Sequence, residues 1–162
     1  NLWALKLPKV NWLVASSDWA MWKDMGPDLW FDRFTPVLKK IADSTLPLEE
    51  RRSAAQSLGQ KWSPSIKRTF QMLVENPEEP TELRIDATKR LRRKPSNDNF
   101  YAFMKALTPD TDRELLFQLS RALKVKNPGG PSIKPDLDDL EVSVAIDKWQ
   151  SWWKDFKKTL DK

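Results

Sequence analysis

The chain has 162 residues, of which 40% are hydrophobic and 31% are charged, and 28 basic against 23 acidic residues give a net charge of +5. This length and balance are typical of a folded globular domain and argue against intrinsic disorder. Because the sequence contains no Cys and no His, it excludes disulfide frameworks, thiol nucleophiles, imidazole bases and the common zinc sites.

The N-terminal residues are interpreted as an arm over residues 1–15, followed by one helical domain over residues 16–162. Lys6, Pro8, Lys9 and Asn11 interrupt the apolar residues of this arm, which makes it too short and too polar to span a bilayer. The chain begins with Asn instead of Met, so we expect a processed or trimmed N-terminus. With the lack of Cys, this favours an extracytoplasmic compartment such as a periplasm or a lumen, with the cytoplasm as the alternative.

The first two helices are predicted over residues 17–25 and 28–41, separated by Gly26-Pro27. Two related segments then follow at a spacing of 33 residues, over residues 47–58 and 80–91, and Pro, Arg, Ala and Leu coincide in them. In each segment Pro and acidic residues open the helix, where a missing N–H costs nothing and negative charge is favoured. The Ala and Leu positions are interpreted as packing positions between neighbouring helices.

The helices between these segments begin at Ser63-Pro64 and near Ser96, and we expect them to end at Asn76-Pro77 and before Pro109. A third copy of the repeat over residues 112–123 keeps the Leu at a spacing of 32 residues. It has Leu116 and Leu119 where the other copies have Arg and Ala. This copy is therefore a degenerate member.

Residues 127–135 contain three Pro and two Gly, which predicts a loop. The final helix is predicted from Asp136 as its N-cap to about Leu160, with acidic residues at its start and lysines at its end. One broad apolar face is expected on this helix, formed by Leu137, Leu140, Val144, Ile146, Trp149, Trp153 and Phe156.

About eight helices in antiparallel pairs predict an all-α fold, a short α-solenoid of about four pairs closed by a long Trp-rich capping helix. The unit Pro-x-x-x-Arg-x-x-Ala-x-x-x-Leu, followed by a helix opening at Ser-Pro, resembles bacterial HEAT-like repeats. The ending over residues 145–154 resembles the terminal helix of such arrays in planctomycete-type proteins. The resemblance implies scaffolding and protein binding, and some related sequences accompany large redox complexes.

Eight of the nine tryptophans gather near the two ends of the chain, and only Trp62 lies between them. They either seal the ends of the repeat core or form a docking surface, since Trp is enriched among residues that dominate interface energies. Trp152 and Trp153 point about 100° apart on a helix, and Trp153 lies nearer the apolar face, so Trp152 is predicted to be the more exposed. The partner-binding candidates are Trp3, Trp12, Trp19, Trp22 and Trp152.

A basic run over residues 89–94 adds five further candidates, Lys89, Arg90, Arg92, Arg93 and Lys94. These cations either complement the C-terminal end of a solvated helix or contact an acidic protein surface, a phosphate backbone or lipid headgroups.

The leading hypothesis is a non-catalytic binding or assembly subunit of a larger protein complex, for which the resemblance implies an oxidoreductase. We expect no catalytic residue, no cofactor and no metal site. Self-association through the two unlike ends of the repeat stack is a further hypothesis. The alternatives are a HEAT-like nucleic-acid-binding module that uses the basic run, and a peripheral membrane adaptor anchored by Trp3 and Trp12 with Lys6 or Lys9.

Overall fold

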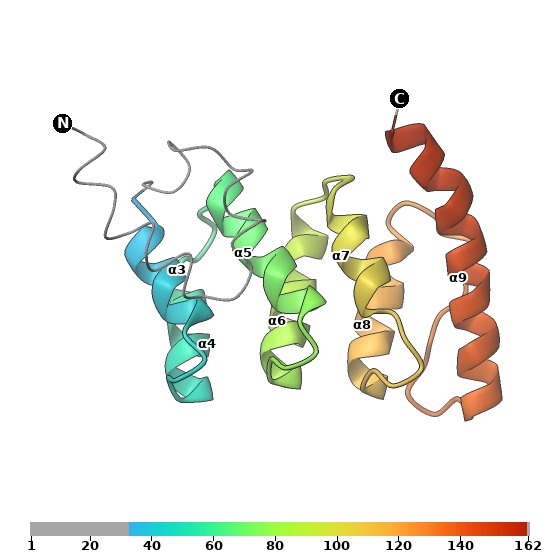
Figure 1. Cartoon of the computed structure of the whole chain (residues 1–162), viewed down its shortest axis with the longest axis horizontal. Helices are drawn as coiled ribbons and strands as arrows, with labels where there is room; N and C mark the ends of the chain where they lie inside the picture. The colour runs from blue at the N-terminus through green and yellow to red at the C-terminus, as the bar shows by residue number, and fades with distance from the viewer. Residues whose placement is uncertain (1–32, 162) are drawn as a thin grey trace. The chain divides into compact units, whose positions relative to one another are not determined.

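The computed structural model describes residues 33–161, and the regular structure of these residues is entirely helical (Figure 1). The all-α class is thus confirmed for them, whereas the predicted arm over residues 1–15 and the helix over residues 17–25 lie outside this range. Within the described range, no helix combines the length and the apolar character needed to cross a membrane. The helices are α3 (Thr35–Ala42), α4 (Leu48–Ser57), α5 (Pro64–Glu75), α6 (Thr81–Arg93), α7 (Asn99–Ala106), α8 (Arg113–Leu123) and α9 (Asp139–Leu160).

The described residues divide between two compact units, with the boundary inside α5 after Thr69. In the first unit α3 packs against α4, around a core formed by Phe34, Leu38, Ile41, Ala55, Leu58 and Ile66. In the second unit α8 packs against both α6 and α7, around a core that includes Leu83, Leu91, Phe103, Leu115 and Leu119. Leu58 and Leu91, which the repeat pairs at a spacing of 33 residues, are both buried.

The starts of α4, α5 and α6 follow the predicted signals, and that of α8 falls where the third copy of the repeat begins. Pro47 and Pro80 each stand one residue before a helix in the same extended conformation, and their carbonyls accept the first backbone bonds of α4 and α6. The Ser63 hydroxyl accepts a bond from the Ile66 N–H at 3.1 Å, and the Asp112 carboxylate caps α8. Side-chain caps of this kind satisfy N–H groups that have no partner inside the helix.

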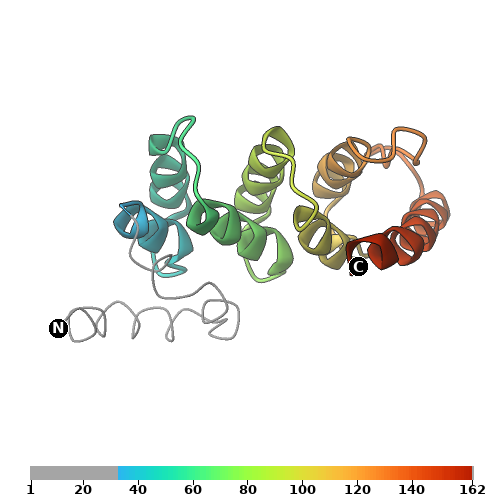
Figure 2. The same ribbon diagram turned by 90° about the horizontal axis from the view of Figure 1, so that it is seen from above.

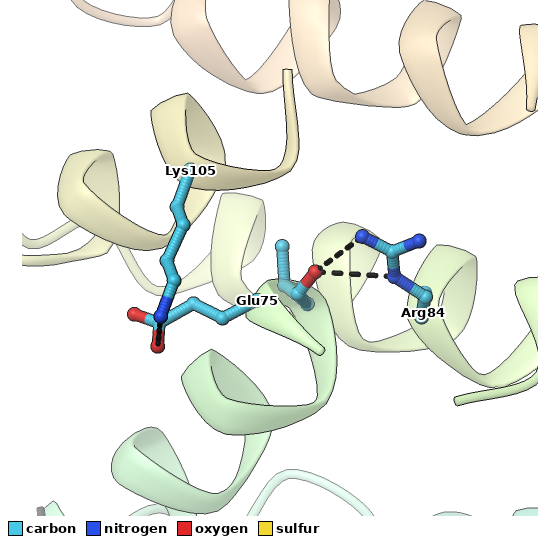
Figure 3. A network of polar contacts seen from close by, with 4 residues as sticks. Glu75, Arg84 and Lys105 are labelled. Carbon is cyan, nitrogen blue, oxygen red and sulfur yellow. Dashed lines mark hydrogen bonds and ion pairs between the residues drawn. The ribbon is translucent and has the colours of Figure 1, made fainter. Parts of the chain in front are cut away.

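The repeat arginines have a role that the sequence pattern did not assign. Arg51 donates from Nε to the carbonyl of Ile41 at 2.8 Å, and Arg84 donates from Nε and Nη2 to the carbonyl of Val74 at 3.1 and 2.8 Å. Each acceptor precedes its arginine by ten residues and lies in the last turn of a helix. Figure 3 shows the two bonds of Arg84 beside the end of α5. The two arginines therefore close equivalent turns in the two units.

The third copy closes the same turn with a different group. Leu116 stands where an arginine is expected and is buried, so the corresponding carbonyl, that of Ala106, needs another donor. Thr111 supplies it from its side-chain hydroxyl, 2.6 Å from the Ala106 oxygen, which also accepts from the Thr108 N–H at 3.0 Å. The departure from the repeat pattern thus exchanges one capping side chain for another.

The boundaries of three helices differ from prediction. The described part of the helix predicted over residues 28–41 becomes helical only at Thr35, with a Pro in its first turn. A turn in which the Ser96 hydroxyl donates to Asp98 delays α7 until Asn99. Asp136 does not cap α9, because the chain first makes a turn between Lys134 and Leu137 and the cap falls on Asp138.

The apolar face of α9 is also narrower than predicted. Its buried residues are Val142, Ala145, Ile146 and Trp149, whereas Leu140 and Val144 are 73% and 45% exposed. The helix carries two apolar stripes, and only the one that includes Trp149 meets the rest of the second unit. The prediction was wrong because it merged the two stripes into one face.

Candidate interaction surface

The cations of the basic run at the end of α6 have different surroundings. Arg90 is half-buried, with its guanidinium 5.1 Å from the centre of the Phe70 ring, and Arg93 and Lys94 are exposed. Arg92 is half-buried near Arg121 of α8. Lys89 is half-buried as well. The five cations of the run therefore do not form one continuous positively charged stripe.

Arg92 lies in an electrostatically unfavourable position for a cation. Burial lowers the pKa of Arg92, and the neighbouring charges of Arg121 and Arg93 lower it further. Arg92, Arg93 and Arg121 are like charges that repel one another, and an anion placed among them would relieve that repulsion.

An aromatic cluster joins α7 to the second half of α9. The ring of Phe100 lies edge-on to the rings of Trp152 and Phe156, at centroid distances of 6.1 and 5.7 Å. Trp152 stacks on Phe156 at 4.9 Å, and Trp153 meets Tyr101 edge-on at 5.0 Å. Edge-to-face and stacked pairs of this kind are the favoured geometries of aromatic side chains. The five rings form one continuous cluster, and Figure 2 shows α7 beside the C-terminal part of α9.

Only part of this cluster belongs to the core. Phe100 is buried, Trp152, Trp153 and Phe156 are half-buried, and Tyr101 is 38% exposed. The sequence predicts that Trp152 is more exposed than Trp153, but both rings are half-buried. The cause is that the rings of Phe100, Trp149 and Phe156 all pack against Trp152.

Lysines cover the exposed edge of the cluster. The Nζ of Lys126 lies 5.5 Å from the centre of the Phe156 ring, and that of Lys157 lies 5.9 Å from the centre of the Tyr101 ring. These distances are within the range of cation–π attraction. The Tyr101 hydroxyl donates to Asp161 at 3.2 Å, and burial together with this bond raises the pKa of Tyr101.

Arg92 and the aromatic cluster meet at a shallow hollow. Arg92, Phe100 and Val125 are among the residues that line it, and Val125 is largely exposed. Arg92 is the one cation of the basic run that lines this hollow. We define the aromatic–basic surface by the residues around the hollow and the cluster, namely Arg92, Tyr101, Arg121, Val125, Lys126, Trp152, Trp153, Phe156 and Lys157.

Of the residues proposed from sequence, Arg92 and Trp152 lie on this surface. Trp3, Trp12, Trp19 and Trp22 lie outside the described residues. Sequence reasoning missed Tyr101, Val125 and Lys126, since these belong to α7 and to the turn after α8, which only the tertiary fold brings beside α9. The one available signal was the position of Tyr101 within the helix predicted between Ser96 and Pro109.

The surface combines apolar area with positive charge. Half-buried rings offer apolar area, and the cations around them offer charge for carboxylates or phosphates. The chain has no match among protein-family models, curated proteins or solved structures.

Proposed function

We propose that this chain is a non-catalytic protein-binding module, an assembly or scaffold subunit of a larger complex, and that its aromatic–basic surface contacts an acidic, partly apolar surface of the partner. The observation that carries the proposal is the half-buried aromatic cluster edged by Lys126 and Lys157. Aromatic residues and arginine are enriched at the energetic centres of protein interfaces.

We further infer that the helices are HEAT-like repeats of a short α-solenoid of antiparallel pairs, with α9 as the capping helix. Support comes from Arg51 and Arg84, each of which bonds a carbonyl ten residues earlier in its own unit. A family of such scaffolds implies an oxidoreductase complex as the partner, and the lack of Cys favours an extracytoplasmic compartment.

A protein is favoured over a nucleic acid as the partner for two reasons. The cations of the basic run face different neighbours, whereas a phosphate backbone calls for a continuous row of them. A carboxylate also borders the surface, since Asp161 accepts a bond from Tyr101. The peripheral membrane alternative depends on residues 1–15, which the structure does not describe.

The test compares two pairs of charge reversals in the full chain. Lys126→Glu with Lys157→Glu changes the surface. Lys154→Glu with Lys158→Glu is the matched control, because both control residues are exposed and lie on α9, the helix that carries Lys157. Capture of the partner from native extract, followed by crosslinking and mass spectrometry, is expected to fall at least about tenfold for the first pair, because reversal places like charges in contact. The control pair is expected to capture as the native chain does.

Equal capture by both pairs would contradict the proposed surface. Loss of capture after nuclease treatment would show that the partner is a nucleic acid and not a protein. In that case, binding to duplex DNA would weaken steeply with salt and be lost on changing Arg92, Arg93 and Lys94 to Glu.

A further inference from the structure

The first half of α9 carries an apolar stripe that no described residue covers. Leu140 and Val144, 73% and 45% exposed, lie one helical turn apart. They line a groove of about 350 Å³ together with Pro131, Ser132, Leu137, Glu141, Ala145 and Lys148. Figure 1 shows α9 at the edge of the second unit, with α7 and α8 on one side of it.

Charges of opposite sign flank the apolar centre of this stripe. Glu141 lies about one turn before Val144 and Lys148 about one turn after it, and both side chains are exposed and line the groove. The midpoint between residues 141 and 148 falls between Val144 and Ala145. The stripe is therefore negatively charged before its centre and positively charged after it.

This arrangement is complementary to itself. When two α9 helices are placed antiparallel about a two-fold axis at that midpoint, Val144 of one copy faces Ala145 of the other, and this contact forms twice. Each Glu141 then faces Lys148 of the other copy, so that the same ion pair forms twice. Interfaces that use one patch on both partners are the rule in two-fold dimers.

We propose that the occupant of this groove is a second copy of the chain, bound through an antiparallel pair of α9 helices. The apolar contact between Val144 and Ala145 of the two copies, with Leu140 at its margin, stabilises the pair, and the two Glu141–Lys148 contacts fix its direction. One helix face is a small interface, so the association is reversible and depends on concentration.

The inference goes beyond the proposed function and is independent of it. The stripe lies in the first half of α9, whereas Trp152, Trp153 and Phe156 of the aromatic–basic surface lie in the second half. A variant of the stripe is therefore expected to leave partner capture unchanged. Failure of one proposal can be distinguished from failure of the other.

The first test is sedimentation of the full chain over a range of concentrations. Leu140→Asp with Val144→Asp is expected to raise the monomer–dimer dissociation constant at least about tenfold, because it places charge in the apolar centre. Both residues are exposed, so the fold should be retained, which circular dichroism checks. Gln150→Asp, at an exposed position on another side of α9, is the control and should leave the constant unchanged.

The second test uses the two charges. Glu141→Lys yields a chain with two cations on the stripe, and Lys148→Glu yields a chain with two anions, so each variant alone should dimerise more weakly than the native chain. A mixture of the two should form mixed dimers, because both contacts become attractive again. The chain that carries both changes should dimerise as the native chain does.

Two results would overturn the inference. One is a native chain that sediments as a monomer at all concentrations. The other is self-association that the Leu140 and Val144 changes leave intact, or that gives no preference for mixed dimers when the two charge variants are combined.

Discussion

Arginines 51 and 84 show how a charged residue becomes part of a repeat core. Both are buried, at 2% and 7% exposure, and burial lowers the pKa of Arg84 while the charge of Glu79 opposes this change. The last carbonyls of a helix have no partner inside it. A guanidinium, with donors in a fixed fork, can reach such a carbonyl from the next helix.

We predict that Arg84→Met lowers the free energy of unfolding by about 2 kcal/mol, because it leaves the Val74 carbonyl buried without these two bonds. Arg84→Lys should recover only part of this loss, since an ammonium cannot reproduce the fork. Urea denaturation of both variants measures the effect.

Arg52→Met is the control for this prediction. The Arg52 side chain is 32% exposed and lies 3.8 Å from the exposed carboxylate of Glu49, a contact that contributes about 0.5 kcal/mol or less. A loss at Arg52 as large as the loss at Arg84 would show that charge, and not the carbonyl bond, is responsible.

At the scale of elements, the loop over residues 127–135 is held by α9 and α8. The Trp149 indole donates to the Pro131 carbonyl at 2.8 Å, and the Ser120 hydroxyl accepts from the Ile133 N–H at 3.0 Å. The composition of this segment predicted a loop, but its fixed path depends on bonds from two helices. A Lys124 bond to Ser132 at 2.8 Å adds a third attachment.

Gly130 gives a sharp test of that attachment. A methyl group at Gly130 would lie 2.1 Å from the buried Trp149 ring, whereas one at Gly129 would meet only the Asn127 side chain at 3.8 Å. We predict that Gly130→Ala costs about 1–3 kcal/mol, as overpacking does. Gly129→Ala should change stability by less than about 0.5 kcal/mol. Thermal unfolding compares the two, and equal midpoints would contradict the close packing of Gly130 on Trp149.

Most helices could be predicted from local signals. Ser63, Pro80 and Asp112 mark helix starts because capping depends on residues within one turn. The start of α9 could not be placed from its four acidic residues, since any of them can cap and the turn after Lys134 decided between them.

At the scale of the whole molecule, the repeat arginines place one equivalent bond in each compact unit. We predict that the losses of Arg51→Met and Arg84→Met add in the double variant to within about 0.5 kcal/mol, because their acceptors are different and distant in sequence. Chemical denaturation of the two single variants and the double variant measures the sum. A coupling above about 1 kcal/mol would mean that the two turns are not separate structural units.

The sequence by itself determined the all-α class of the described residues, the helix starts at Pro47, Ser63 and Pro80, and the pairing of Arg51 with Arg84 and of Leu58 with Leu91. These features depend on contacts within a turn or on a repeated spacing, both of which can be read along the chain.

The tertiary structure alone decided which stripe of α9 is buried, that Tyr101 and Lys126 join Trp152, and that Thr111 replaces an arginine. Periodicity reports that a helix has apolar faces, but which face loses its water depends on what packs against it. Burial is set by neighbours distant in sequence, and so the candidate surface emerged only with the fold.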